Sequence, residues 1–381
     1  MYKFIAILLT SVLFCSPFFF IRTKVTAIES ISLGILGDSN SDEYRANDNR
    51  AAGTQYEVTT LNWAELLVKK RNVNIGPWGT WGEPRRSGYK YNWARSGATP
   101  ASMISTGQLT GLAEQVRNGE IQYVIISIGS NDFHSWNGTY NEVYNNILND
   151  AQVQQKVNSI IANITLAVDT LQSAGNVKIV VTNYPDPALS VDFLNQFPDA
   201  QKRLRVTNAI QKINQGLITM TASRHIVLGD MSSLATSILS LVDLTGNITI
   251  EGEKIMLTPH GDEPHHLQLG DSVGHAGTVL NGFIANLFIT SFLNGYGVNI
   301  GTFTNHEILL HAGIVSKTPA TSPVQTKPGD GNNDGKVNGS DYILWLKNYS
   351  TNATGPSVGD FNSSGRVDGA DYILWLNNYN R

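Results

Sequence analysis

The sequence predicts an α/β fold in which a parallel sheet lies between two layers of helices, a three-layer α/β/α sandwich, with a small α-helical domain after it. Apolar runs rich in Val and Ile, typical of buried parallel strands, alternate with longer segments of helical periodicity. A segment rich in Pro, Thr and Ser interrupts this pattern, and two near copies of one unit follow it. The chain has 381 residues, 41% of them hydrophobic, which is enough for one large domain and one small one.

The expected elements of the large domain alternate along the chain. Strands are expected at residues 31–36, 73–75, 123–128, 177–182 and 225–228, and helices at residues 62–70, 112–118, 153–172, 200–221 and 278–293. Ligand sites in open parallel sheets lie outside the carboxyl ends of the strands. Residues just after 36, 128 and 182 are therefore candidates for a functional site.

The N-terminus is expected to direct export. Lys3 precedes an apolar run over 4–21, and residues 25–27 supply a cleavage site, so we predict a signal peptide at 1–27. An uncleaved membrane anchor is the alternative for this run, and either outcome makes the protein secreted or bound to the cell surface. The only cysteine, Cys15, falls in this segment, so the mature protein forms no disulfide. The further boundaries that we expect are 28–314 for the large domain, 315–328 for a linker and 329–381 for the repeats.

The charge of the chain excludes one class of partner. Lys and Arg together number 27 against 31 Asp and Glu, which gives a net charge of −4, and no basic run is present. A protein that follows a phosphate backbone needs a concentration of positive charge. Nucleic acid is therefore not an expected partner.

Ser39 is the first candidate for catalysis. It stands in the sequence Gly-Asp-Ser-Asn at 37–40, where a buried strand gives way to a tight turn. A serine hydroxyl becomes an effective nucleophile when a base removes its proton, so this position requires a histidine elsewhere in the chain. The alternative is that Ser39 caps a following helix, because Asp, Ser and Asn are good N-cap residues.

Three further segments follow in order. Asn-Trp-Ala-Arg-Ser-Gly-Ala-Thr at 92–99 contains Gly97, and Ile-Gly-Ser-Asn-Asp at 128–132 places Asn131 just after an expected strand. The third segment, at 271–282, contains Asp271 and His275 and leads into the last expected helix.

These four segments together resemble the GDSL/SGNH hydrolases, whose fold is flavodoxin-like. The resemblance implies that Ser39 is the nucleophile, that His275 is its base, and that Asp271 orients the imidazole. It further implies that the Gly97 backbone N–H and the Asn131 side chain stabilise the oxyanion, for which a neutral amide donor is well suited. Family members carry the aspartate three residues before the histidine, whereas the separation here is four, and Gly274 is a candidate for the extra residue.

Some assignments stay open at this point. Asp262 is another acid that could orient His275, whereas His260 and His265 are interpreted as loop residues without a catalytic role. The residues Trp78, Trp81 and Trp136 either line a sugar or acyl site or cover the core.

The repeats predict two calcium loops of the EF-hand type, with oxygen ligands at loop positions 1, 3, 5, 7, 9 and 12 and a glycine at position 6. Lys336 and Arg366 contribute backbone carbonyls at position 7, and we expect weaker binding by the second loop because Ser364 replaces a carboxylate. The expected ligands are Asp330, Asn332, Asp334, Lys336, Asn338 and Asp341 in the first loop and Asp360, Asn362, Ser364, Arg366, Asp368 and Asp371 in the second. An Asn- and Asp-rich loop without metal is the alternative.

The pair of loops resembles dockerin type I modules, which implies a cohesin-like protein partner. Both copies have Asp at position 12, where an ordinary EF-hand has Glu, and this favours the dockerin comparison. Trp345 and Trp375 follow the loops at the same interval and are expected to fill the core of the small domain, with presentation to a partner as the alternative.

The resulting hypothesis is an exported serine esterase that hydrolyses carboxylic esters without a catalytic cofactor. The dockerin resemblance suggests acyl groups on polysaccharide as the substrate. A lipase or phospholipase is one alternative, and a non-catalytic adhesion or scaffold protein is another, for which the unusual spacing of Asp271 and His275 is the argument.

Overall fold

The computed structural model describes residues 30–46, 50–135, 137–271, 274–316, 327–362 and 364–380. The signal peptide expected at 1–27, most of the expected linker and Trp136 lie outside these ranges. The chain divides into two compact units, Met1–Val315 and Ser316–Arg381, which are described separately below. Within the described ranges, no helix combines the length and apolarity that crossing a membrane requires.

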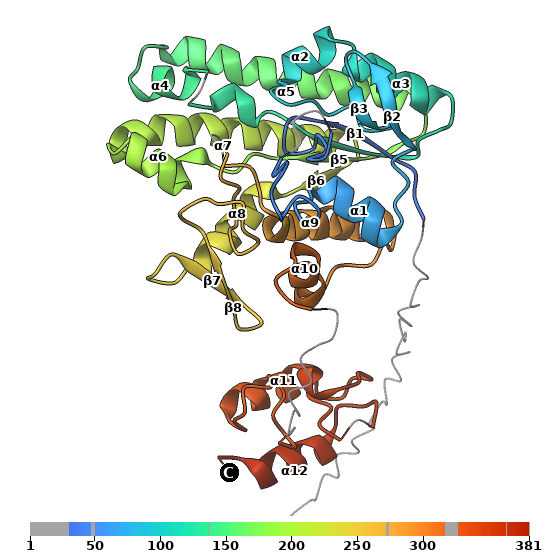
Figure 1. Cartoon of the computed structure of the whole chain (residues 1–381), viewed down its shortest axis with the longest axis vertical. Coiled ribbons are helices and arrows are strands. Elements are labelled where there is room, and N and C mark those ends of the chain that lie inside the picture. Colours follow the sequence, from blue (N-terminus) through green and yellow to red (C-terminus); the bar gives the residue numbers. More distant parts are fainter. Residues whose placement is uncertain are drawn as a thin grey trace, which may run out of the picture. The chain divides into compact units, whose positions relative to one another are not determined.

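A parallel sheet forms the centre of the large unit (Figure 1). Its strands lie in the order β1, β4, β5, β6, and all neighbours are parallel. Their bounds are Leu33–Gly37 for β1, Tyr123–Ser127 for β4, Lys178–Thr182 for β5 and Val227–Gly229 for β6. The strand expected at 73–75 is reduced to a single bridge between Ser32 and Asn74 beside β1. The parallel α/β prediction is thereby confirmed, with a shorter fifth strand than expected.

Ten α-helices of the described residues belong to this unit, and they pack on both faces of the sheet. They are α1 (Trp63–Arg71), α2 (Pro100–Ser105), α3 (Gln108–Arg117), α4 (Thr139–Tyr144), α5 (Asp150–Ala174), α6 (Val191–Gln196), α7 (Ala200–Ser223), α8 (Met231–Ser240), α9 (Thr278–Tyr296) and α10 (Asn305–Ala312). Val124 and Ile126 of β4 pack into one apolar core with α3, α5 and α7. Tyr123 and Ile125 pack into a second core with α1, α9 and α10. The alternation along β4 therefore separates two cores, one on each face of the sheet.

Local sequence explains where the long helices begin. Asn62 caps α1 by accepting a hydrogen bond from the Glu65 N–H, and the Glu65 side chain accepts one from the Asn62 N–H in return. Asn149 and Gln152 form the same reciprocal pair at the start of α5. Each pair satisfies N–H groups that have no partner inside the helix.

Two hairpins and two short 3₁₀ helices complete the large unit. The hairpins are β2 (Trp78–Gly82) with β3 (Arg86–Tyr89) and β7 (Asn247–Ile250) with β8 (Glu253–Met256), and the 3₁₀ helices are η1 (Ser130–Phe133) and η2 (Pro187–Leu189). Trp78 and Trp81 lie on β2 and are partly exposed. The Trp81 Nε1–H donates to the Gly88 carbonyl 2.9 Å away, which ties this indole to its own hairpin.

The small unit has an internal two-fold repeat. Its helices are α11 (Gly339–Asn348) and α12 (Gly369–Asn378), with η3 (Pro356–Val358) between them. The Trp345 Nε1–H donates to the Asp368 carbonyl at 2.8 Å, and the Trp375 Nε1–H donates to the Asn338 carbonyl at 2.9 Å. Each indole thus binds the loop of the other repeat, and Trp345 belongs to the core. Both tryptophans take part in the packing of the unit itself.

Candidate active site

The turn after β1 presents Ser39. Asp38 accepts hydrogen bonds at its carbonyl from the Ser41 N–H at 3.0 Å and the Asp42 N–H at 2.9 Å, which closes a tight turn around Ser39. The next α-helix along the chain, α1, starts at Trp63 and is capped by Asn62. Ser39 is therefore not a helix cap, and the alternative interpretation of its position is wrong.

The Asp38 carboxylate joins this turn to the loop after β4. Its Oδ1 accepts from the Asn40 N–H at 3.0 Å, and its Oδ2 accepts from the Ser130 hydroxyl at 2.7 Å. Burial raises the pKa of Asp38, although these hydrogen bonds and the charge of the nearby His275 oppose the shift. Because Ser130 precedes Asn131, the carboxylate fixes the nucleophile turn relative to the Asn131 amide.

Gly97 and Asn131 lie side by side at the expected place beyond the strands. The Asn131 Nδ2 donates to the Ala98 carbonyl at 2.9 Å, which leaves its second N–H for another acceptor. Gly97 has a φ of +77°, a conformation that side chains rarely adopt, and a Cβ at this position would meet no protein atom within 4 Å. The backbone conformation and the open space before it, rather than crowding by neighbours, explain the glycine.

His275 is held by Asp271 in spite of the extra residue between them. The His275 Nδ1 lies 2.6 Å from Asp271 Oδ2, and the His275 backbone N–H donates to Asp271 Oδ1 at 3.1 Å. Gly274 absorbs the longer spacing in a turn, with a φ of +64° and its N–H donating to the Asp271 carbonyl at 3.2 Å. The turn at Gly274 therefore lets Asp271 contact the His275 ring across a separation of four residues.

Arg50 is a third member of this cluster. Its Nη1 donates to Asp271 Oδ2 at 2.8 Å, the same oxygen that contacts His275. Burial by itself raises the pKa of Asp271, but the hydrogen bonds and charge of His275, together with the charge of Arg50, hold the pKa well below its ordinary value. These interactions favour the carboxylate form of Asp271 over its protonated form.

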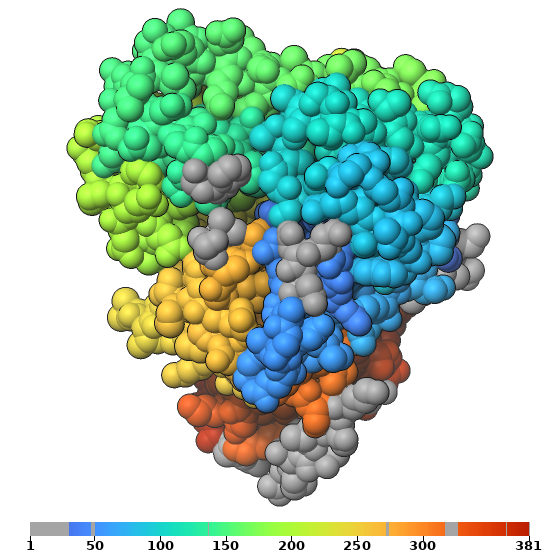
Figure 2. Space-filling view, turned by 45° about the horizontal axis from the view of Figure 1, so that its top comes forward, coloured from blue at the N-terminus to red at the C-terminus, as the bar shows by residue number. Residues whose placement is uncertain are grey.

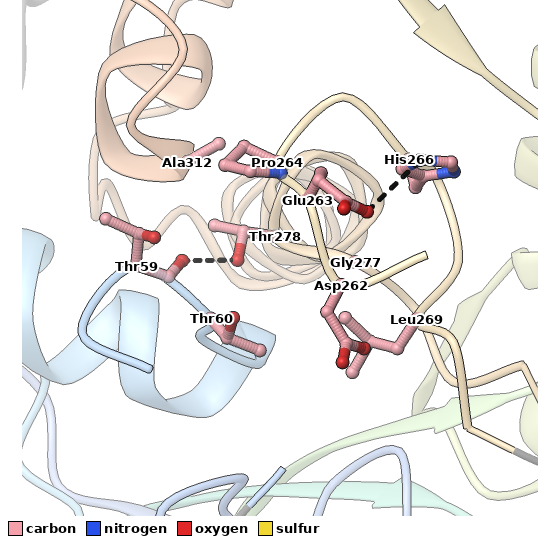
Figure 3. A pocket seen from close by; sticks show the side chains of 10 residues that line it. All are labelled: Thr59, Thr60, Asp262, Glu263, Pro264, His266, Leu269, Gly277, Thr278 and Ala312. Atoms are coloured by element: carbon pink, nitrogen blue, oxygen red, sulfur yellow. Dashed lines mark hydrogen bonds and ion pairs between the residues drawn. The ribbon is translucent and has the colours of Figure 1, made fainter. Parts of the chain in front are cut away.

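Asp262, the other candidate for orienting His275, lines a pocket that does not include His275. It lines a small pocket with Glu263, His266 and Thr278 (Figure 3), and its Oδ1 accepts from the Gly270 N–H at 3.1 Å. The described contacts of the His275 ring with a carboxylate go to Asp271, so the geometry favours Asp271 over Asp262 as the acid that orients the imidazole.

The remaining histidines and tryptophans are distributed as follows. His265 pairs with Glu253 at 3.5 Å on the surface, as expected of a loop residue. His260 lines the same cleft as His275, where its Nε2 lies 3.3 Å from Asp192 Oδ2, so it is closer to the site than expected. Trp78 and Trp81 do not line this cleft.

A cleft of about 840 Å³ brings the candidate residues together. Ser39, Gly97, Asn131 and His275 all line it. In Figure 2 the blue segment that contains the loop after β1, the gold segment that contains the loop before α9 and the green segments above them border a hollow on one face of the molecule. Among the described residues, no hydrogen bond joins Ser39 Oγ to His275 Nε2; such contacts tighten in many enzymes when substrate is bound.

The sequence of the large unit matches a known family. The model of the GDSL-like Lipase/Acylhydrolase family matches residues 33–243, which is more than half of the chain. The chain belongs to this family. It is accordingly a carboxylic ester hydrolase. The match includes Ser39, Gly97 and Asn131 and ends before Asp271, so the pairing of Asp271 with His275 comes from the geometry.

Solved structures similar to the hydrolase include an extracellular lipase from Streptomyces rimosus, with 16% identity and a TM-score of 0.40 over 70% of this chain and 99% of that chain. A carbohydrate esterase of family 3 from Talaromyces cellulolyticus has 14% identity and a TM-score of 0.38 over 69% of this chain and 97% of that chain. No curated protein matches the chain.

Two residues of the hydrolase's site were missed by the sequence analysis. Arg50 lies 221 positions before Asp271, and no local pattern links the two. Asp38 stands inside the recognised Gly-Asp-Ser segment, so its position was visible, but its bond to Ser130 depends on β1 and β4 being neighbours.

Proposed function

We propose that the large unit hydrolyses carboxylic esters through a covalent acyl-enzyme on Ser39. The observation that carries the proposal is the 2.6 Å contact between His275 and Asp271 at the edge of the cleft that also contains Ser39, Gly97 and Asn131. A nucleophile, an oriented base and oxyanion donors thus line one space.

The proposed reaction begins when His275 Nε2 takes the Ser39 proton and Ser39 Oγ forms a bond to the ester carbonyl carbon. The carbonyl oxygen becomes an oxyanion that accepts hydrogen bonds from the Ser39 and Gly97 backbone N–H groups and from Asn131 Nδ2. The bond to the alcohol oxygen then breaks, and this oxygen receives the proton from His275. Water, deprotonated by His275, attacks the acyl-enzyme, and collapse of the second intermediate releases the acid and returns the proton to Ser39.

Covalent labelling tests this proposal. A fluorophosphonate is expected to form an Oγ–P bond with Ser39 and release fluoride, because the activated serine attacks phosphorus as it attacks a carbonyl. Mass spectrometry of peptides should show one adduct on Ser39. The Ser39→Ala protein should remain unlabelled, whereas the Ser190→Ala protein, changed at another serine that lines the cleft, should label normally. An adduct elsewhere, or none, would overturn the proposal.

The cellular setting of this proposal rests on sequence alone. The signal peptide supports secretion or surface attachment, and the dockerin resemblance supports acylated polysaccharide as the source of the ester. Lipid esters are the competing substrate class. The non-catalytic hypothesis is dropped, because family membership makes the chain an ester hydrolase.

We also propose that the small unit binds calcium. In each loop, hydrogen bonds from backbone N–H groups already hold the loop around a carboxylate whose oxygens suit this ion. The Asp330 carboxylate accepts from the Asp334 N–H at 3.2 Å and from the Gly335 N–H at 2.8 Å. Asp360 repeats this with the N–H groups of Ser364 at 2.9 Å and Gly365 at 3.0 Å. Each carboxylate oxygen has two lone pairs, and Asp360 Oδ2 also accepts from the Gly355 N–H at 3.1 Å. These bonds therefore leave capacity for an ion on both oxygens of Asp330 and on Oδ1 of Asp360. The donor set therefore fits a hard cation.

The position-12 aspartates close the loops in the same way. Asp341 and Asp371 are fully buried and accept backbone N–H groups from both ends of their loops. No three His, Cys, Asp or Glu side chains of the described residues form a metal-binding group. The remaining ligands of a calcium ion would be the carboxylates of Asp334 and Asp368 together with the amide, hydroxyl and backbone oxygens of the ligand set predicted from the sequence.

A cohesin-like partner is proposed for the same unit. Each repeat exposes three apolar side chains at equivalent positions, which are Ile343, Leu346 and Tyr349 in the first and Ile373, Leu376 and Tyr379 in the second. Exposed apolar residues that cluster in this way mark protein interaction sites.

Removal of calcium is expected to lower the melting temperature of the small unit and to leave ester hydrolysis unchanged. An ion present at a hundred times its Kd stabilises a folded unit by about 2.7 kcal/mol. Calorimetry of the full chain with and without EDTA measures the change. Asp341→Asn should reproduce it in the presence of calcium, whereas Asp150→Asn, at an exposed carboxylate of α5, should not. Identical transitions with and without EDTA would refute calcium binding.

A further inference from the structure

The cleft continues well beyond the catalytic residues, along the carboxyl edge of the sheet. Ser39 follows β1, Asn131 follows β4, Tyr184 follows β5, and α8 begins just after β6. Residues from all four places line the one cleft. Three strand spacings separate β1 from β6, which amounts to about 14 Å. The space therefore extends for this distance from Ser39 to the N-terminal part of α8.

The far part of the cleft has apolar walls. On α8 the apolar residues Met231, Leu234, Ala235 and Ile238 recur at the spacing of one helical face, and all four line the cleft. The first three are only half-buried, so this face is not fully covered by the core. Leu280 and Ile284 of α9 line the cleft as well, as do the apolar side chains of Phe133, Tyr184, Phe193 and Ile210. Asn183, Ser190 and Gln196 add neutral polar groups to this lining.

The charges of the cleft exclude anionic groups from this part. No lysine or arginine is among the described residues that line the cleft, and Asp38 and Asp192 contribute carboxylates. A phosphate or carboxylate on the substrate would lose its hydration without gaining a cationic partner, which is unfavourable. The walls therefore suit a neutral apolar group.

The position of His275 indicates which part of an ester occupies this space. The leaving alcohol takes its proton from His275 and must lie against it. The His275 ring packs edge-on against Tyr44 of the loop after β1, with ring centroids 6.4 Å apart, and pairs with Asp271. The alcohol thus belongs at the β1 end of the cleft, and the acyl group extends in the other direction, past Asn131 toward α8.

We infer that the substrate is an ester of an uncharged acyl chain long enough to reach α8. This inference rests on the proposed function of Ser39. Three extended single bonds span about 3.6 Å, so about 14 Å corresponds to a chain of roughly twelve carbons. Acetyl groups leave most of the apolar wall in contact with water, whereas a twelve-carbon chain covers it. The inference concerns the acyl part and applies equally to glycerol and sugar esters.

A series of p-nitrophenyl esters from acetate through butyrate and octanoate to laurate tests the inference, because the leaving group stays constant. Each methylene that enters the apolar part is expected to raise kcat/KM by up to about fourfold, the factor that corresponds to about 0.8 kcal/mol per buried CH₂. The laurate ester should exceed the acetate ester by at least about tenfold. A series that is flat or falls with length would overturn the inference.

Variants of α8 test whether the dependence of kcat/KM on acyl-chain length arises at this helix. Ala235→Phe fills the distal cleft and is expected to lower kcat/KM for laurate by about tenfold or more, while butyrate, which does not reach α8, is hydrolysed as by the wild type. Ser237→Phe makes a similar change on the exposed face of the same helix and should affect neither ester. Equal losses for laurate and butyrate would overturn the assignment of this wall. A flat series that still depends on Ser39 leaves the proposed function standing, whereas no Ser39-dependent turnover of any ester defeats that function itself.

Discussion

Replacement of Ser39 by alanine is expected to lower kcat by about four to six orders of magnitude. The change removes the atom that forms the acyl-enzyme, so only direct attack by water remains, assisted by the oxyanion donors of Gly97 and Asn131. Ser39 is buried and its hydroxyl accepts and donates no hydrogen bond within the described residues, so the variant should fold normally. KM is expected to change little, because substrate binding depends mainly on the walls of the cleft.

The measurement is steady-state hydrolysis of one p-nitrophenyl ester by wild type and variant, with circular dichroism to verify folding. Ser190→Ala, at the N-cap of α6, is the matched control, since it deletes the same atom elsewhere in the cleft from a side chain that makes no capping bond. A Ser39→Ala enzyme within tenfold of wild type would contradict the acyl-enzyme mechanism.

The periodic signals of the sequence predicted the framework well. The helix expected at 200–221 is α7 at Ala200–Ser223, and the one expected at 278–293 is α9 at Thr278–Tyr296. Long segments carry enough apolar repeats to define a face. The strand expected at 73–75 has only three residues and makes one bridge at Asn74, because so short a run forms few hydrogen bonds with its neighbour.

The parts that were missed depend on short elements and long-range contacts. α8 has ten residues and many serines, and neither its helical form nor its apolar face toward the cleft was expected. Hairpin β7 and β8 was also missed, since four-residue strands give little alternation. Sequence motifs identified Ser39, Gly97 and Asn131 as candidate site residues. The hydrogen bonds that position them, such as the one from the Ser130 hydroxyl to Asp38, form only after the strands have paired.

Asp271→Asn is expected to lower kcat by about 10⁴-fold with little change in KM. In the wild type, Asp271 Oδ2 accepts from both Arg50 and His275 Nδ1, while Oδ1 accepts from the His275 backbone N–H. An asparagine has one acceptor oxygen, so its NH₂ group must face at least one of these donors in either orientation. The imidazole then loses the carboxylate that fixes its tautomer and stabilises its protonated form, and the ion pair between Arg50 and Asp271 is lost.

Asp262→Asn is the matched control, because it makes the same change in the same loop. The Asp262 carboxylate accepts a hydrogen bond from the Gly270 N–H and makes no described contact with His275. Its kcat should stay within about twofold of wild type, because the asparagine oxygen can still accept the hydrogen bond from the Gly270 N–H. Loss of activity in Asp262→Asn with retention in Asp271→Asn would reverse the assignment of the orienting acid. The result expected here would show that an aspartate four positions before the histidine can orient it, because the Gly274 turn brings the carboxylate to the imidazole.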